Sequence, residues 1–88
     1  MDKSIFEILN ELITLLEMHG EHSWAYGFRN SMNEFHFSPT EAKSKIRRVY
    51  GGMGSFNDLV LQDKTGFLPA ENEELSRLRH ELYAACSK

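Results

Sequence analysis

The sequence predicts an all-α fold: a small four-helix domain with a structured glycine-rich loop before the last helix. Three observations predict it. Apolar residues recur at helical spacing in four separate stretches of the chain. Serine, proline and glycine residues stand where helices begin and end. Only residues 51–69 lack this spacing, and a chain of 88 residues has the length of one domain, 1–88.

The first predicted helix spans residues 4–18 and ends before Gly20. Its apolar side chains cover about half of the helix circumference. They are Ile5, Phe6, Ile8, Leu9, Leu12, Ile13, Leu15 and Leu16. Such a wide face is typical either of the central helix of a bundle or of a helix with spare surface for a partner, and both readings stay open.

The second predicted helix spans residues 21–33. Three large side chains share one face at i, i+4 and i+8: Trp24, Phe28 and Met32. Gly27 inside a helix costs about 1 kcal/mol relative to alanine, so we expect a neighbouring backbone to approach closely there. Residues 35–37 should form a connector with two aromatic anchors, Phe35 and Phe37.

A capping box marks the start of the third predicted helix. Ser38 stands at the N-cap, Pro39 at the first helical position and Glu41 two residues later. The apolar side of this helix consists of Ala42, Ile46, Val49 and Tyr50. Residues 51–52, both glycine, should stop it.

The loop and the last helix follow. Ser55 can cap a single turn through Asp58, after which residues 59–61 should be extended, 62–66 a turn and 67–68 a return strand, so that a very short hairpin can form. The last helix should start at Pro69 or Ala70. It carries a narrow apolar stripe and two expected i,i+4 ion pairs, Glu73–Arg77 and Arg77–Glu81. The stripe is Leu75, Leu78, Leu82 and Cys86 (or Ala85).

Composition limits the compartment and the chemistry. Cys86 is the single cysteine, so no intramolecular disulfide can form, which favours a reducing compartment. The N-terminal apolar stretch is interrupted by polar residues and no stretch is long enough to span a membrane, so we expect a cytoplasmic protein with no membrane partner. We expect no metal and no cofactor, because the four histidines are not spaced as metal ligands are. We expect no enzymatic activity, because the sequence contains no recognisable pair of a nucleophile and a base.

The net charge of −3 hides a basic segment, 43–48. Its four cations are spread around a helical wheel rather than forming one stripe: Lys43, Lys45, Arg47 and Arg48. We interpret them as a solvated face that pairs with acids of the first helix. Contact with nucleic acid is the alternative, and the overall acidity argues against it.

The most distinctive motif is the run from 51 to 59, Gly-Gly-Met-Gly-Ser-Phe-Asn-Asp-Leu. Glycine-rich loops can cradle phosphate, but this one lacks the Lys-Ser/Thr ending of a P-loop and follows no strand. We interpret it as a chain reversal in which Ser55, Asn57 and Asp58 bond to local backbone.

This motif resembles one shared by a family of small, functionally uncharacterised bacterial proteins of about this length. The resembling positions are Gly51, Gly52, Gly54, Ser55, Asn57 and Asp58. The resemblance implies a bacterial origin and a coherent domain. It implies no activity, but it does suggest that the polar residues of the motif matter to whatever the family shares.

Size, acidity and the wide face of the first helix favour a non-catalytic protein-binding module, like an immunity protein, an antitoxin or a small adaptor. Phe6 and Ile13 on one margin of that helix, and Ile8 and Leu15 on the other, are candidates for partial exposure. Glu7, Glu11 and Glu17 would steer a basic partner toward them. The same face could form a homodimer. The alternative function is a nucleic-acid-associated regulator that uses segment 43–48, and a small-ligand role of the glycine loop is a third hypothesis.

Overall fold

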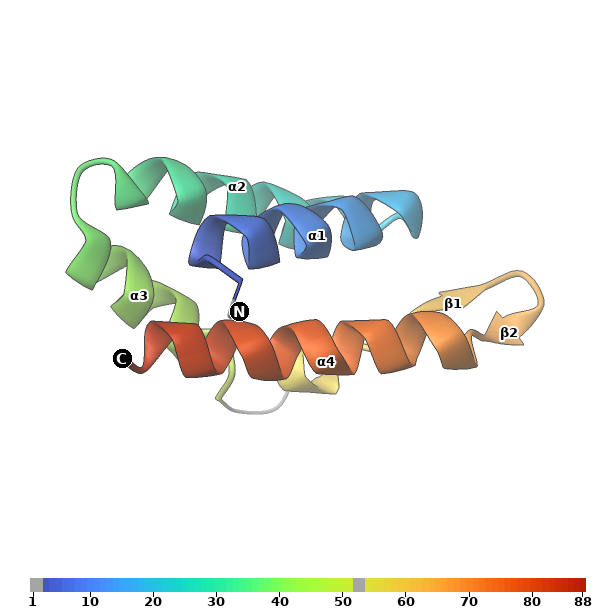
Figure 1. Ribbon diagram of the computed structural model, residues 1–88. Coiled ribbons are helices and arrows are strands. Elements are labelled where there is room, and N and C mark those ends of the chain that lie inside the picture. The colour runs from blue at the N-terminus through green and yellow to red at the C-terminus, as the bar shows by residue number, and fades with distance from the viewer. Residues whose placement is uncertain (1–2, 52–53) are drawn as a thin grey trace.

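The computed structural model describes residues 3–51 and 54–88 and consists of four helices and one small hairpin (Figure 1). The predicted all-α, four-helix fold class is therefore confirmed. The elements in chain order are α1 (Ile5–Met18), α2 (His22–Phe35), α3 (Pro39–Arg48), the 3₁₀ turn η1 (Phe56–Asp58), β1 (Gln62–Asp63), β2 (Gly66–Phe67) and α4 (Pro69–Cys86).

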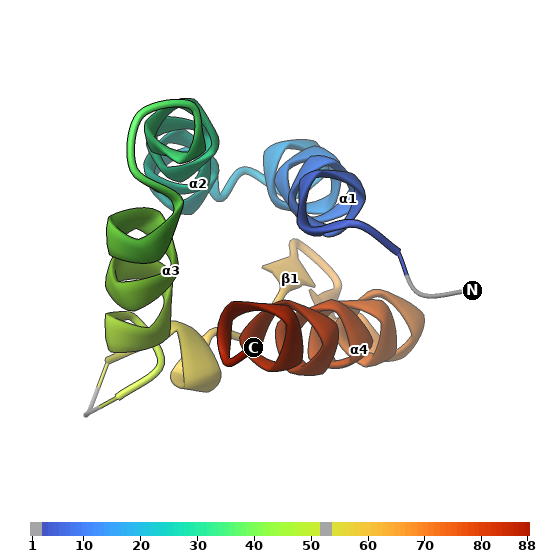
Figure 2. The ribbon, with the colours of Figure 1, turned by 60° about the vertical axis from the view of Figure 1, so that its left-hand side comes forward.

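The helices pack in a ring. α1 packs against α2 and α4, α2 against α3, and α3 against α4. Figure 2 shows the four helices around the core, with the hairpin at one end of α4 and η1 between α3 and α4. α1 and α4 run antiparallel, and α3 is inclined to both (Figures 1 and 2). Among the described residues, no helix is long and apolar enough to cross a membrane.

α1 has the limits that its sequence predicts. The Ser4 hydroxyl accepts a hydrogen bond from the Glu7 backbone N–H at 3.2 Å, and Gly20 adopts a φ of 78° just past the helix end. Five side chains are buried between α2 and α4: Ile8, Leu9, Leu12, Ile13 and Leu16. Because α1 packs on two neighbours, most of its wide apolar face is core.

Two expectations for the second helix and its connector are wrong. α2 continues to Phe35, so Phe35 anchors the end of a helix rather than a connector, while Phe37 is 87% exposed and anchors nothing. A Cβ built on Gly27 would meet nothing within 4 Å, so no backbone approaches closely there. The exposed position tolerates glycine because α2 is held by packing of its other face.

α3 begins at the predicted residue but without the predicted capping box. The Ser38 side chain makes no cap hydrogen bond, and only its backbone carbonyl accepts, from the Ala42 N–H at 3.0 Å. Pro39 sets the helical φ at the first position, which is sufficient to start the helix here. α3 ends at Arg48, and Tyr50 lies in the turn beyond it.

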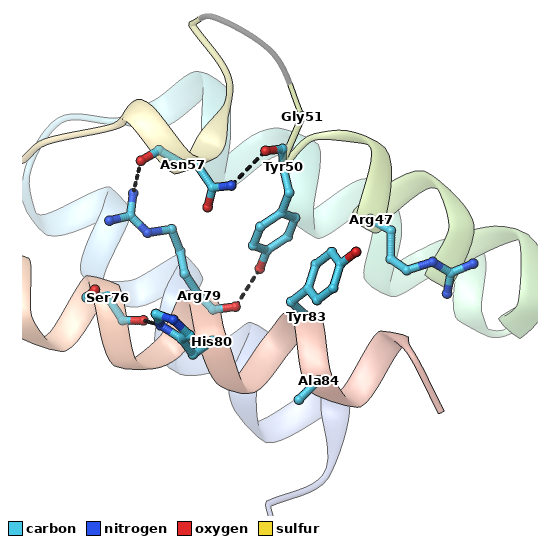
Figure 3. Close-up of a pocket in the computed structure, with 9 residues that line it drawn as sticks. All are labelled: Arg47, Tyr50, Gly51, Asn57, Ser76, Arg79, His80, Tyr83 and Ala84. Atoms are coloured by element: carbon cyan, nitrogen blue, oxygen red, sulfur yellow. Dashed lines mark hydrogen bonds between the residues drawn. The ribbon is translucent and has the colours of Figure 1, made fainter.

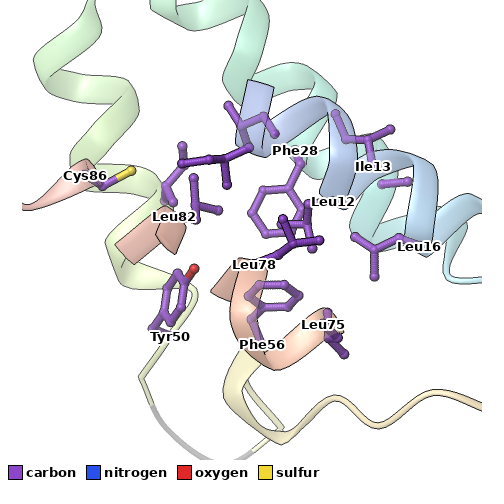
Figure 4. Packing of buried hydrophobic residues seen from close by; sticks show 14 of the residues in the cluster. Leu12, Ile13, Leu16, Phe28, Tyr50, Phe56, Leu75, Leu78, Leu82 and Cys86 are labelled. Atoms are coloured by element: carbon purple, nitrogen blue, oxygen red, sulfur yellow. The ribbon is translucent and has the colours of Figure 1, made fainter. Parts of the chain in front are cut away.

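The loop after α3 contributes to the core through Phe56. This side chain is fully buried, and its backbone N–H donates to the Val49 carbonyl at 2.8 Å. Its ring lies 4.9 Å from that of Phe28 and 5.5 Å from that of Tyr50, in edge-to-face contacts (Figure 4), and 5.2 Å from that of Trp24. The loop thus packs into the bundle, as expected.

A hairpin forms, but not where the extended residues were expected. The strands are the pairs 62–63 and 66–67, with Gln62 opposite Phe67, so the predicted five-residue turn shrinks to two residues. The turn is held by the Asp63 carboxylate, which accepts from the Thr65 N–H at 2.8 Å. Residues 59–61 form no strand.

The side chain of Asn72, in the first turns of α4, binds both backbone groups of Leu61. Its side-chain oxygen accepts from the Leu61 N–H at 2.8 Å, and its side-chain nitrogen donates to the Leu61 carbonyl at 2.9 Å and to the Leu68 carbonyl at 2.7 Å. Together with the Leu68 N–H, which donates to the Leu61 carbonyl at 3.4 Å, these bonds satisfy the backbone of the buried Leu61 beside β1.

The apolar stripe of α4 is confirmed, because Leu75, Leu78, Leu82 and Cys86 are all fully buried. The expected Glu73–Arg77 pair is replaced by one between Arg77 and Glu74, while the Arg77–Glu81 pair forms as expected.

Candidate functional site: a groove between α3 and α4

A depression of about 750 Å³ lies where α3, the glycine-rich loop and α4 meet (Figure 3). One wall is a single face of α4, formed by residues spaced three and four apart. The other wall comes from the end of α3 and the loop. The lining residues are Arg47, Tyr50, Gly51, Asn57, Ser76, Arg79, His80, Tyr83 and Ala84.

A second depression, of about 470 Å³, continues the first one toward the C-terminal end of α4. Its lining residues are Thr40, Lys43, Arg47, Tyr83, Ser87 and Lys88. Arg47 and Tyr83 line both depressions, so the two depressions form one continuous groove. We call their combined lining the α3–α4 groove.

Tyr50 forms the floor of this groove. Its hydroxyl donates to the Arg79 backbone carbonyl at 2.9 Å, and its ring meets that of Tyr83 edge-to-face at 5.0 Å (Figure 3). Burial, which disfavours the charged phenolate, raises the pKa of Tyr50 well above its ordinary value. The hydroxyl therefore stays protonated at neutral pH and serves as a structural donor.

Arg79 joins α4 to the loop. Its Nη1 donates to the carbonyls of Phe56 at 2.8 Å, Leu59 at 3.0 Å and Asn57 at 3.3 Å, and its guanidinium lies 5.7 Å from the centre of the Phe56 ring. Burial lowers its pKa, although arginine stays charged. Among the described residues its Nε and Nη2 have no hydrogen-bond partner, so these donors remain for a ligand.

The basic segment 43–48 is divided by the fold. Arg47 Nη1 donates to the Cys86 carbonyl, and Lys43 Nζ lies 3.5 Å from the Lys88 carbonyl, so both meet the C-terminal end of α4. Lys45 instead pairs with Glu34 of α2 at 2.9 Å, and Arg48 is exposed. The expected pairing with acids of the first helix is wrong: two cations line the groove and the other two do not.

Most of the motif residues bond to local backbone. Asn57 Nδ2 donates to the Tyr50 carbonyl at 2.7 Å, Ser55 Oγ to the same carbonyl at 3.4 Å, and the Gly54 N–H to the Asp58 carboxylate at 2.8 Å. Ser55 precedes η1 without making the expected side-chain cap. Gly51 lines the groove, and Gly52 lies outside the described residues.

This arrangement argues against phosphate binding by the loop itself. The Gly54 N–H, which a phosphate would need, already donates to a carboxylate. Gly54 has a φ of 75°, a conformation that glycine adopts without strain. The geometry thus supports the interpretation of the motif as a chain reversal.

The partner surface expected on α1 is present in part: Phe6, Glu7 and Glu11 are exposed and Leu15 and Glu17 are half-buried, while Ile8 is only 3% exposed. Ile13 is only 5% exposed, because α1 is central to the bundle, so it cannot contribute as expected. Glu11 pairs with Lys3 at 2.6 Å, and Glu17 pairs with Arg29 at 2.9 Å. Phe6 is 39% exposed, although its ring packs against Phe35 and His36. Beside it, Glu7 is exposed.

Among residues 3–51 and 54–88, no three His, Cys, Asp or Glu side chains are grouped so that they could hold a metal ion. His80 Nδ1 lies 2.9 Å from the Ser76 carbonyl (Figure 3). Cys86 is fully buried, and burial raises the pKa of its thiol to about 11. At neutral pH it is a neutral core side chain rather than a nucleophile.

Sequence reasoning missed Tyr50, Arg79 and Tyr83 as groove residues. A signal for the α4 wall was present, since Ser76, Arg79, His80 and Tyr83 recur at helical spacing beside the buried leucine stripe. What they face could not be read from that spacing, because α3 is distant in the sequence.

A family model described as a domain of unknown function (DUF6966) matches residues 17–69. The match is more than half of the chain and agrees with the resemblance to a functionally uncharacterised family, and it includes the glycine-rich motif. It ends at the first residue of α4, so the α4 wall of the groove lies beyond it. The chain matches no curated protein and no solved structure.

Proposed function

The chain belongs to this family of domains of unknown function, and we propose that it is a non-catalytic binding module that binds another polypeptide in the α3–α4 groove. One observation carries the proposal: the groove is cationic in an acidic protein. Lys43, Arg47, Arg79 and Lys88 line it, no aspartate or glutamate of the described residues 3–51 and 54–88 does, and the net charge of the chain is −3.

Four of the six cations outside the groove have carboxylate partners, whereas Arg48 and Lys64 form no ion pair among the described residues. Lys3, Arg29, Lys45 and Arg77 each lie within ion-pair distance of a glutamate. Lys43, Arg47 and Arg79 form no such pair with an aspartate or glutamate among the described residues: Arg47 and Arg79 donate to backbone carbonyls, and Lys43 donates to the main-chain oxygen of Lys88. An anionic group from outside would therefore gain charge-assisted hydrogen bonds from Arg47 and Arg79 without displacing an aspartate or glutamate side chain of the described residues.

A polypeptide is favoured over nucleic acid by the small extent of the positive charge. Nucleic-acid binding needs a broad basic surface that neutralises several phosphates. Here Lys45 is engaged by Glu34, Arg48 lines neither depression, and the chain as a whole has a net charge of −3. The tyrosines of the groove, Tyr50 and Tyr83, are residues that protein interfaces use as contact area.

Site-specific photo-crosslinking in the native host tests this proposal. A benzophenone amino acid replaces Ala84, which is exposed and lines the groove, or Asn30, which is exposed on α2 and lines neither depression. We expect a discrete protein adduct from position 84 and none from position 30. The adduct at position 84 should disappear when Lys43→Glu is added.

Two outcomes would overturn the proposal. Adducts from the probe at position 30, or from a further probe placed at Glu7 of α1, with none from position 84, would move the binding surface elsewhere. Adducts at position 84 that nuclease removes would make the protein a nucleic-acid-associated regulator instead.

A further inference from the structure

We infer that the occupant of the α3–α4 groove is an extended acidic peptide segment that carries at least two carboxylates, one for each end of the groove. The inference rests on the proposed function and names the class of partner. It follows from how the cations are distributed along the groove and from the character of the surface between them.

The groove has the length of a short extended peptide. Its α4 wall runs from Ser76 to Ser87. At 1.5 Å per helical residue, this wall is about 16 Å long. An extended chain advances about 3.3 Å per residue, so about five residues fill the groove.

Positive charge stands at both ends. At one end, Arg79 presents Nε and Nη2, and His80 lies beside it (Figure 3). At the other end, Lys43 and Arg47 lie over the last turn of α4. Arg47 also uses only its Nη1 internally, which leaves Nε and Nη2 without a hydrogen-bond partner among the described residues.

The middle of the groove, where the two depressions meet, is lined by Tyr83 and Arg47. Tyr83, which is 44% exposed, and Ala84 lie between the two cationic ends. The two sites are separated by about 10 Å, estimated from Arg79 to Cys86 along α4. Residues two or four apart in an extended peptide point to the same side, about 7 or 13 Å apart, and long side chains bridge the difference.

This distribution distinguishes an acidic peptide from a single small anion. One phosphate or carboxylate could occupy only one end, whereas a peptide with two carboxylates engages both ends and covers the tyrosine between them. Because the cations are only partly buried, the attraction should be moderate and should fall with salt.

The experiment is an NMR titration of the full chain with hexaglutamate, with hexaglutamine, hexalysine and oligothymidylate as comparison ligands. We expect hexaglutamate to shift the amide signals of Ser76, His80, Ala84 and Ser87, and to bind more weakly as salt rises. Hexaglutamine and hexalysine should leave these signals unchanged, and inorganic phosphate should shift one end of the groove only.

Two variants on the same helix make the test specific. Lys43→Glu should weaken hexaglutamate binding by at least about fivefold, because it replaces attraction by repulsion at one end. Arg48→Glu makes the same kind of charge change outside the groove and should alter binding by less than about twofold. Lys43 makes a single long hydrogen bond, so the variant should fold, and its amide spectrum shows directly whether it does.

The inference is overturned if hexaglutamate leaves the groove signals unchanged, if both variants weaken binding equally, or if oligothymidylate binds more tightly. A failure with hexaglutamate alongside a Lys43-dependent protein adduct at position 84 would reject the acidic peptide and retain the binding module. The absence of both would reject the two together.

Discussion

Arg77 and Arg79 are two residues apart on α4 and lie on opposite sides of the helix. Their side chains bind different kinds of partner. Arg77 is exposed, pairs with Glu74 and Glu81 and lies 4.0 Å from Glu11 of α1, and its hydrogen bond to Glu74 is the main reason that its pKa is raised. Arg79 donates to backbone carbonyls of the loop, and burial lowers its pKa.

The difference shows what a charge contributes when its partners differ. Carboxylates on the Arg77 side can be hydrated if the arginine is removed, so the ion pairs there contribute little. Carbonyls on the Arg79 side belong to a turn whose central residue, Phe56, is fully buried, so they depend more on their donor. The groove side of α4 is therefore the side that holds the loop in place.

The largest expected effect is the loss of stability when the Arg79 side chain is removed. Arg79→Ala should lower the free energy of unfolding by about 2–3 kcal/mol, because part-buried carbonyls lose a charged donor. Arg77→Ala, the matched control, should unfold at nearly the wild-type denaturant concentration. Urea denaturation of both variants measures the difference. Equal losses would show that the loop does not depend on Arg79.

Alkaline pH should weaken the end of α4 that meets the groove. The pKa of Cys86 is about 11 in the folded protein, against an ordinary value of 9.0. The folded state therefore retains a proton that the unfolded state releases, so this contribution is intact below pH 9 and is lost as pH rises toward 11. The loss should reach about 2 kcal/mol at pH 11.

The control for this prediction is Cys86→Ala, in which the steep fall between pH 9 and 11 should become shallower. The raised pKa of Tyr50 acts in the same direction; burial is its main cause and persists in the variant, but the charge of Cys86 also raises it, so the difference between the proteins reports on the coupled pair. Parallel pH profiles would show that the buried thiol contributes nothing to the alkaline transition.

A smaller effect is expected within the loop motif. Asp58→Ala removes the acceptor of the Gly54 N–H and should destabilise the protein by about 1 kcal/mol, as the loss of a cap does. Thermal melting measures it. If the variant melted like wild type yet lost its cellular phenotype, Asp58 would be a functional residue and not only a structural one.

The smallest expected effect is the change in stability when salt screens the ion pairs of Arg77. Raising NaCl from about 0.1 M to about 1 M screens the exposed ion pair between Arg77 of α4 and Glu11 of α1. Unfolding of the wild type should change only slightly, and the change should be absent from Arg77→Ala. A large salt dependence that persists in Arg77→Ala would place the important ion pairs elsewhere.

Much of the fold followed from local patterns. The limits of α1, with Ser4 before it and Gly20 after it, depend on residues adjacent in the sequence. The same holds for the buried stripe of α4, where helical periodicity alone selects Leu75, Leu78 and Leu82. The start of α3 was predicted correctly because of Pro39, although the expected Ser38 cap does not form.

Contacts between distant segments were not predictable in the same way. Nothing near Asn72 in the sequence indicates that its amide bonds both backbone groups of Leu61, and nothing near Arg79 indicates that it faces the carbonyls around Phe56. Ile13 was named as a candidate for exposure because its neighbours on one helix cannot reveal which side of that helix the rest of the bundle covers.

The sequence by itself determined four helices, their apolar faces and a polar chain reversal at the glycine-rich motif, because these depend on periodicity and on residues close together in the chain. Only the tertiary structure decided which cations are neutralised and which are not. Lys45 and Arg47 are two positions apart on α3, yet one meets Glu34 of α2 and the other meets the end of α4. The groove exists because α3 and α4 meet at an angle, and such an arrangement is set by the packing of the whole core.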